Sequence, residues 1–209
     1  MSLVKELKIV TVRHGLTEYN KKRVMSGWND IDLSEVGILQ LKQLKKEVTY
    51  PQTDRYVTSG LKRAKDTFEI LFGDSQELHG SYEGFNEVNF GKIEAQPIDV
   101  VSEPFYEGFL NEKSYEEGET LDEFSKRNMD QLIQLCDELI EDNLDSVTIV
   151  SHSGTARLFD WIFNEKKREQ YRSPSMPNGL GHIFIVDYNP VTKTFKLKQQ
   201  LPVSASHQS

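Results

Sequence analysis

The stretch KIVTVRHGLTEYN, from Lys8 to Asn20, decides how the rest of the chain is interpreted. The run from Leu7 to Val12 is rich in β-branched residues and ends near a glycine, so it is predicted to be a buried strand. Arg13 and His14 follow directly, at the carboxyl end of that strand. In open α/β sheets this is the edge at which ligands bind. The stretch therefore predicts a strand that carries a guanidinium and an imidazole to a binding crevice.

A second stretch, SVTIVSHSGT from Ser146 to Thr155, repeats the pattern. A β-branched run again ends in a histidine that is followed by a glycine. If the two strands are parallel and adjacent, His14 and His152 meet in one crevice at the carboxyl edge of the sheet.

The elements between these stretches alternate between the strand period and the helix period, which is typical of an α/β fold. We expect a three-layer sandwich: a mostly parallel central sheet, helices on both faces, and an antiparallel carboxyl-terminal edge. One domain should cover residues 1–209, and residues 80–119, which mix Gly, Pro and aromatics, should form a lid or insert made of a long loop with one short helix. Four further helices are predicted: one from about 35 to 48 capped by Ser34, one after residue 60 capped by Ser59, one opened by the capping box Thr120–Glu123, and one at about 155–163. A strand is predicted at 55–60, and a hairpin that turns at Asn189 follows near the end of the chain.

Composition excludes several classes of protein. The chain has 209 residues, a net charge of −8 and one cysteine. No basic run suggests nucleic acid or membrane binding, no internal disulfide is possible, and neither a signal peptide nor a membrane-spanning stretch is expected. We therefore expect a cytoplasmic protein with a small-molecule substrate and a disordered tail at 204–209; the oligomeric state is not predicted. An anionic substrate would need a local basic pocket.

The strand ends supply such a pocket. Arg13, His14 and His152 are joined by Arg63, which lies in the first turn of the helix after the second strand. Arginine forks bind phosphate with paired hydrogen bonds, and a neutral histidine can attack phosphorus to give a phosphohistidine. The leaving oxygen then needs a proton from a carboxylic acid. Glu87 is one candidate, although Glu83 and Glu94 are close in sequence and the local pattern does not choose among the three. No His spacing typical of a metal site is present, so no metal is expected.

Six blocks, VRHGLTEYN, SGWNDIDLSEVG, TSGLKRAKDT, NEVNFGKIEA, GETLDEF and VSHSGTAR, occur in an order and spacing that resemble the histidine phosphatase superfamily, the phosphoglycerate mutase-like clan. The resemblance covers residues 7–188. It implies His14 as the nucleophile, Glu87 as the proton donor, and a phosphate held among Arg13, Arg63 and His152. It also implies that the substrate pocket is lined by Asn20, Ser26, Gly27 and Ser153.

The family contains mutases and phosphatases, and charge offers a way to choose between them. A mutase must hold a bisphosphate and needs a second cationic cluster, which the mutases resembled here carry as an arginine pair in the lid. From residue 88 to 117 this chain has only Lys92 and Lys113 as cations, against seven acids: Glu94, Asp99, Glu103, Glu107, Glu112, Glu116 and Glu117.

We therefore expect a metal-independent phosphomonoester hydrolase that forms a phosphohistidine on a small phosphorylated metabolite and needs no cofactor. The alternative is a phosphoglycerate mutase primed by 2,3-bisphosphoglycerate, which the block SGWNDIDLSEVG favours. A non-catalytic sensor of a phosphorylated ligand is a lesser alternative.

Overall fold

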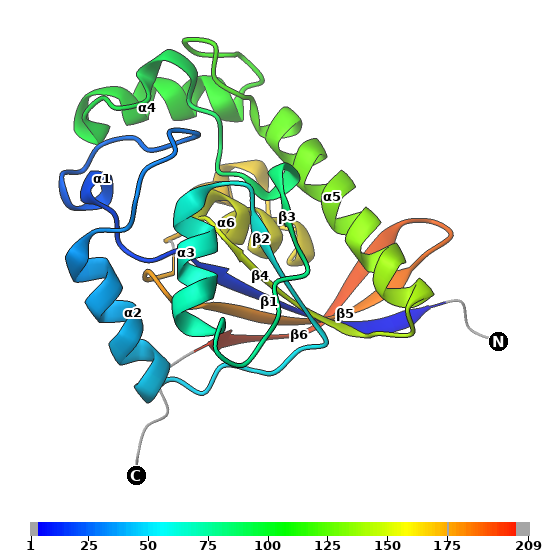
Figure 1. Ribbon diagram of the computed structural model, residues 1–209. Helices are drawn as coiled ribbons and strands as arrows, with labels where there is room; N and C mark the ends of the chain where they lie inside the picture. Colours follow the sequence, from blue (N-terminus) through cyan, green and yellow to red (C-terminus); the bar gives the residue numbers. More distant parts are fainter. Residues whose placement is uncertain (1–3, 175, 204–209) are drawn as a thin grey trace.

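The structure is a computed structural model that describes residues 4–174 and 176–203, so the tail expected to be disordered lies outside the described residues. A six-stranded sheet in the order β3-β2-β4-β1-β5-β6 forms its centre (Figure 1). Four strands are parallel, and β5 and β6 add the antiparallel edge, as predicted. The strands are β1 (Lys5–Arg13), β2 (Arg55–Ser59), β3 (Gly80–Tyr82), β4 (Ser146–Ser151), β5 (Gly181–Asn189) and β6 (Thr194–Val203).

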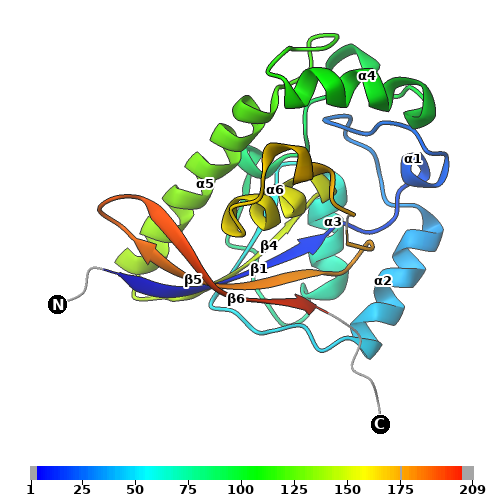
Figure 2. The same cartoon turned by 180° about the vertical axis from the view of Figure 1, so that it is seen from behind.

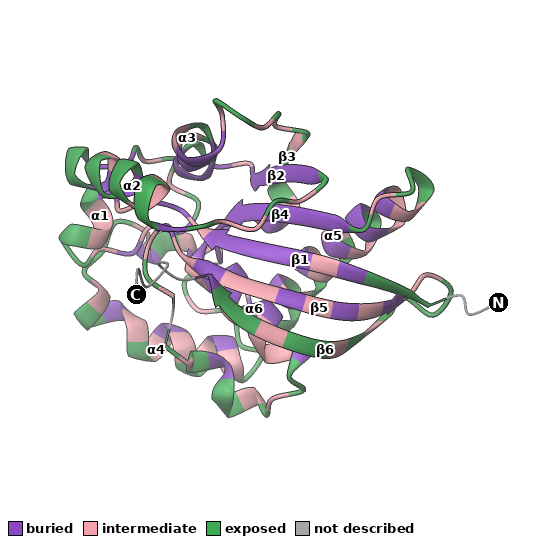
Figure 3. Ribbon diagram, turned by 90° about the horizontal axis from the view of Figure 1, so that it is seen from below, coloured by how far each residue is buried: buried purple, intermediate pink, exposed green. Residues whose placement is uncertain are grey.

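Helices cover both faces of the sheet, so the predicted three-layer sandwich is confirmed (Figures 2 and 3). One face packs against α2 and α3, and the other against α5 and α6, each through its own apolar cluster. The helices are α1 (Glu18–Lys21), α2 (Glu35–Glu47), α3 (Lys62–Leu71), α4 (Ile98–Leu110), α5 (Leu121–Glu141) and α6 (Ser153–Phe163), with 3-10 turns η1 (Glu83–Phe85), η2 (Gly91–Ile93) and η3 (Arg168–Arg172). Over the described residues, no helix is long and apolar enough to span a membrane.

Local sequence explains the central strands and two of the helix starts. Every residue of β2 and β4 is buried, which suits their continuous runs of β-formers. Ser34 accepts a hydrogen bond from the Gly37 amide at the start of α2. Thr120 and Glu123 form the capping box of α5. These caps satisfy amides that have no partner inside the helix.

The segment from 80 to 119 is more helical than expected. The sequence predicts a long loop with one short helix, whereas α4 has 13 residues and two 3-10 turns precede it. The sequence does not predict this helix because Pro97 and Pro104 lie in it or next to it, and proline normally interrupts a helix. Pro97 instead precedes the first turn, and α4 buries Val101, Phe105 and Phe109 at helical spacing in a third apolar cluster. The segment is therefore an ordered wall over the carboxyl edge of the sheet (Figure 1).

Candidate active site

The two histidines meet as the parallel register requires. Arg13 of β1 pairs with Ser151 of β4, so His14 and His152 leave the sheet at the same edge. The His14 amide donates a hydrogen bond to the Ser151 carbonyl at 2.9 Å. The ring centroids of His14 and His152 are 5.2 Å apart. The expectation that the two strands are adjacent and bring the imidazoles together is confirmed.

The backbone selects the reactive nitrogen of His14. Its Nδ1 lies 2.7 Å from the Gly15 carbonyl oxygen, which can only accept a hydrogen bond, so Nδ1 carries the proton in the neutral ring. The Nε2 lone pair is then free. Burial, followed by the charges of Arg63 and Arg13, holds the pKa of His14 well below its usual range. The His14 ring is therefore held in its neutral form, with the lone pair on Nε2.

His152 is completely buried beside His14, and its ring is hydrogen-bonded to Ser59. The Ser59 Oγ lies 2.7 Å from His152 Nε2 and also accepts a hydrogen bond from the Leu61 amide. The prediction that Ser59 caps α3 is wrong: the helix begins only at Lys62, and its cap position is Leu61, without a side-chain bond. Burial, then the charge of Arg63, lowers the pKa of His152.

Arg63 is a fully buried cation with neutral partners. Its Nη1 and Nη2 donate to the carbonyls of Asn29 and Gly27 at 2.9 and 2.7 Å. Among the described residues no carboxylate lies within ion-pair distance of it, and burial lowers its pKa. A buried charge of this kind is costly unless it meets an opposite charge, so Arg63 favours an anion in the cavity. Arg13 also lies there, with its Nη1 donating to the Met176 carbonyl at 2.8 Å.

Of the three carboxylates that the sequence left open, only Glu87 lines the cavity. Its Oε1 accepts hydrogen bonds from the Gly154 and Val88 amides, both at 3.0 Å. Glu94 instead fixes a loop by accepting from the Trp28 amide at 2.8 Å, and Glu83 is exposed. A Cβ at Gly154 would lie 2.1 Å from the Glu87 Oε1, so the carboxylate can occupy this position only beside a glycine.

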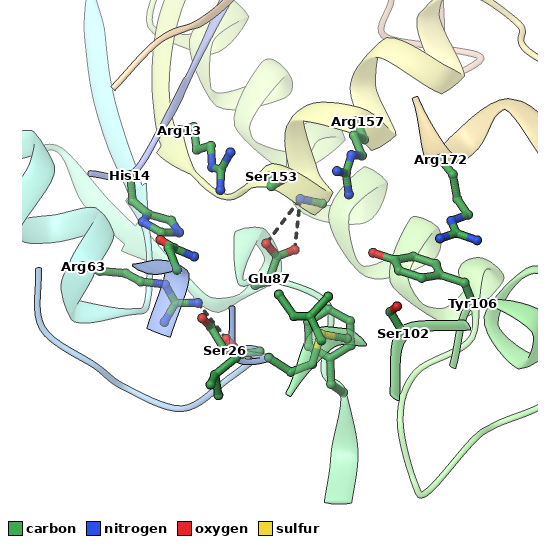
Figure 4. A pocket seen from close by; sticks show the side chains of 17 residues that line it. Arg13, His14, Ser26, Arg63, Glu87, Ser102, Tyr106, Ser153, Arg157 and Arg172 are labelled. Atoms are coloured by element: carbon green, nitrogen blue, oxygen red, sulfur yellow. Dashed lines mark hydrogen bonds between the residues drawn. The ribbon is translucent and has the colours of Figure 1, made fainter. Parts of the chain in front are cut away.

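These side chains surround a cavity of about 330 Å³ at the carboxyl edge of the sheet (Figure 4). His152 lies behind its wall, whereas the other residues expected from the sequence line it: Arg13, His14, Asn20, Ser26, Gly27, Arg63, Glu87 and Ser153. In the described part of the chain no three His, Cys, Asp or Glu side chains gather as a possible metal site.

Nine lining residues were not among the expected site residues, and four of these have polar side chains: Ser102 and Tyr106 of α4, Arg157 of α6 and Arg172 at the end of η3. Arg157 could have been found, because it lies four residues after Ser153 and therefore on the same face of the helix that starts at the histidine. Arg172 has no local signal, since only the fold brings it to the cavity.

None of the seven acids of the lid segment lines this cavity. Asp99 pairs with Arg23, Glu103 with Arg172, Glu112 with Arg168 and Glu117 with Lys92. The side chains that α4 turns to the cavity are Ile98, Ser102 and Tyr106, none of them an acid. Glu103 therefore acts on the cavity only through Arg172, whose charge it balances.

Comparison with known proteins gives a consistent picture. Residues 9–200 match the model of the histidine phosphatase superfamily, branch 1. The chain is 26% identical to a 2,3-bisphosphoglycerate-dependent phosphoglycerate mutase of Treponema denticola, with 88% of each chain aligned. It is also 26% identical to the broad-specificity phosphatase YOR283W of Saccharomyces cerevisiae, over 92% of this chain and 84% of that one. A phosphoglycerate mutase structure from Bacillus anthracis superimposes with a TM-score of 0.73 at 17% identity, covering 93% and 92% of the two chains.

Proposed function

Because the chain belongs to the histidine phosphatase superfamily, we propose that it is a metal-independent phosphomonoester hydrolase that works through a phosphohistidine at His14. The observation that carries the proposal is the neutral His14 ring, whose Nδ1 is tied to the Gly15 carbonyl and whose Nε2 is left free beside Arg13 and Arg63. A phosphate ester is the small-molecule substrate that suits such a cavity.

In the first step, His14 Nε2 attacks phosphorus and the bond from phosphorus to the ester oxygen breaks. Arg13 and Arg63, which line the cavity, stabilise the charge on the equatorial oxygens, and His152 lies buried beside the His14 ring. Glu87, protonated at this stage, gives its proton to the departing oxygen, which leaves as an alcohol. The products of this step are a free alcohol and phospho-His14.

In the second step, water attacks the phosphorus of phospho-His14. Glu87, now ionised, takes a proton from that water, and the P–N bond breaks to return the neutral ring and inorganic phosphate. The Gly154 and Val88 amides hold the carboxylate in place in both steps. The second step returns His14 to its neutral form and Glu87 to its protonated form, so the proposed cycle requires no further cofactor.

A mutase is the second candidate, and one observation favours it: Arg157 and Arg172 supply cations that the lid does not. A bisphosphate would then occupy the cavity and 2,3-bisphosphoglycerate would be the primer. We favour the hydrolase because Arg172 is already paired with Glu103, which leaves the far end of the cavity with little positive charge for a second phosphate dianion.

The test measures phosphate release from a panel of phosphomonoesters in excess chelator, next to an isomerisation assay with 3-phosphoglycerate primed by the bisphosphate. Wild type should hydrolyse esters, and His14→Ala should lose roughly a thousandfold or more of that rate. His79→Ala is the matched control, because His79 is exposed and does not line the cavity. Activity in His14→Ala would contradict the mechanism. Primed isomerisation faster than hydrolysis would establish the mutase, and ligand binding without turnover would establish the sensor.

A further inference from the structure

Glu94 lies outside the cavity, yet its carboxylate holds the loop to which Arg63 donates its hydrogen bonds. Its Oε1 accepts from the Trp28 amide at 2.8 Å and from the Phe90 amide at 3.2 Å. Its Oε2 accepts from the Asn29 amide at 3.0 Å. One carboxylate is therefore bonded to three backbone amides, although the proposed phosphohistidine chemistry does not use it.

A single peptide unit joins Glu94 to Arg63. The carbonyl of Gly27 accepts a hydrogen bond from Arg63 Nη2 at 2.7 Å. The amide of Trp28 belongs to the same peptide unit and donates to Glu94 Oε1. Asn29 makes a second link, since its carbonyl accepts from Arg63 Nη1 at 2.9 Å and its amide donates to Glu94 Oε2. The guanidinium and the carboxylate thus lie at opposite ends of a peptide dipole, and each hydrogen bond strengthens the other.

Gly27 allows the carboxylate to come this close. Its φ of +50° lies in the left-handed region, and a Cβ on it would lie 2.0 Å from Glu94 Oε1. The carboxylate therefore occupies the space that a side chain at position 27 would fill. This is a reason for glycine that is separate from the cavity that Gly27 also lines.

Arg63 is a buried cation, and a buried charge is costly unless an opposite charge compensates it. Its Nε has no hydrogen-bond partner among the described residues. Burial lowers its pKa, and the charges of Glu87, Asp30 and Glu94 oppose that effect. Glu87 gives up and regains a proton in the proposed mechanism, and Asp30 binds the Lys62 amide. Glu94 is therefore the acid whose carboxylate compensates Arg63 and also holds the loop around it.

Resting on the proposed function, we propose that Glu94 is a positioning residue for Arg63: it fixes the loop 27–29 so that the guanidinium meets the phosphoryl group in a productive orientation. The sign of its effect separates this role from that of a charge alone. A nearby anion repels phosphate, so by charge alone the removal of Glu94 would strengthen phosphate binding. If Glu94 positions Arg63, its removal weakens phosphate binding instead.

Calorimetric titration with inorganic phosphate tests the proposal on wild type, Glu94→Gln, Glu94→Asp and Glu107→Gln. Glu94→Gln keeps the size of the side chain but turns an N–H group toward one of the amides, whereas Glu94→Asp keeps the charge on a shorter side chain. Glu107→Gln is the matched control, because it removes one negative charge from an exposed position of α4 that does not line the cavity. We expect Glu94→Gln to weaken phosphate binding about tenfold, Glu94→Asp to weaken it less, and Glu107→Gln to leave it as in wild type.

A double-mutant cycle identifies the residue through which Glu94 acts. Arg63→Lys keeps a charge at the site but lacks the planar fork, so it should weaken phosphate binding on its own. Adding Glu94→Gln should then change little, because the group that Glu94 positions is already gone. Two losses that add would show that Glu94 acts elsewhere, and would overturn the proposal. Stronger or unchanged phosphate binding in Glu94→Gln would overturn it as well, even if that variant is less stable.

The two kinds of measurement separate this inference from the proposed function. If wild type hydrolyses no ester but phosphate binding follows the expected pattern, only the proposed function fails. If wild type hydrolyses esters and Glu94→Gln binds phosphate as wild type does, only the inference fails. A wild type that binds no phosphate would overturn both. If Glu94→Gln does not fold, Glu94→Asp decides the question, because affinity equal to that of wild type would overturn the positioning role.

The leaving group provides a further check where hydrolysis is observed. Arg63 contacts the phosphoryl group, so Glu94→Gln should lower kcat/KM equally for an alkyl phosphate and for 4-nitrophenyl phosphate. The ring of Trp28 also donates to the Glu87 carbonyl at 2.7 Å, which offers a second route from the same loop. A loss confined to the alkyl phosphate would assign the effect of Glu94 to the proton donor and would overturn its assignment to Arg63.

Discussion

Arg127 of α5 does not line the cavity, but its hydrogen bonds hold the segment that carries Glu87 in place. Its guanidinium donates to four successive or nearby carbonyls at 3.0–3.2 Å, those of Glu83, Gly84, Asn86 and Glu87. It also pairs with both oxygens of Glu119 at 2.8 Å. Arg127 therefore positions the segment of the proposed proton donor, and we expect Arg127→Met to affect both stability and catalysis.

The stability effect follows from what the substitution leaves behind. The side chains of Arg127 and Glu119 are only 20% and 16% exposed, so removing the arginine leaves a poorly solvated carboxylate and several carbonyls without their donor. We expect the free energy of unfolding to fall by about 2–4 kcal/mol. Adding Glu119→Gln should recover part of this loss, because the unpaired charge is then absent. Lys126→Met is the control: its pair with Asp130 is exposed, and its loss should cost less than about 0.5 kcal/mol.

The catalytic effect should depend on the leaving group. An alkyl alcohol needs the proton from Glu87, whereas 4-nitrophenolate leaves readily without one. Because Glu87 keeps its bonds to the Gly154 and Val88 amides, we expect about a tenfold loss of kcat for an alkyl phosphate and little loss for 4-nitrophenyl phosphate. Steady-state kinetics on both esters, beside urea unfolding curves, measure the two effects. An equal loss on both esters, or no change in either measurement, would refute the positioning role.

Two further predictions use the same assays. Gly154→Ala should lower kcat for alkyl phosphates by about a hundredfold, because a Cβ 2.1 Å from the Glu87 Oε1 forces the carboxylate to move. The rate with 4-nitrophenyl phosphate should change less. An unchanged rate with alkyl phosphates would show that the position of the carboxylate is not critical. The pKa values of the buried His14 and His152 are lowered, so the protein should become less stable as the pH is lowered below about 6.5. In that range the unfolded chain binds protons that the folded chain does not, and each histidine lowers the free energy of unfolding by about 1.4 kcal/mol per pH unit. Urea unfolding at pH 7.5 and 5.5 measures this, and His14→Ala should show the shallower dependence; equal slopes would place the titration elsewhere.

How far the sequence predicts this fold depends on whether the signal is local. The two strands that end in His14 and His152 carry their own pattern, and parallel register alone then brings the rings together. The helix α4 was underestimated because Pro104 is a strong local signal against a helix, whereas burial of Phe105 and Phe109 outweighs it.

The site shows the same division. Ser59 is a residue type that often caps helices, but α3 begins only at Lys62, and the Ser59 hydroxyl bonds both His152 and the Leu61 amide. Glu87 could not be chosen over its neighbours from spacing, because the choice depends on the Gly154 amide 67 residues away in the chain. Arg172 reaches the cavity only through the position of η3 beside α4, which no local pattern encodes.

The charge of the chain and the charge of its cavity have opposite signs, and the two act at different distances. The chain has a net charge of −8, yet the described residues that line the cavity include four arginines and a single carboxylate, that of Glu87. Surface charges are screened within about 10 Å at 0.1 M salt, while charges in a buried cavity are screened far less. Added salt should therefore weaken the repulsion that an anionic ester meets on approach more than the attraction that it meets once inside. An acidic surface is thus compatible with a strongly cationic site, because burial rather than net charge sets the potential at the substrate.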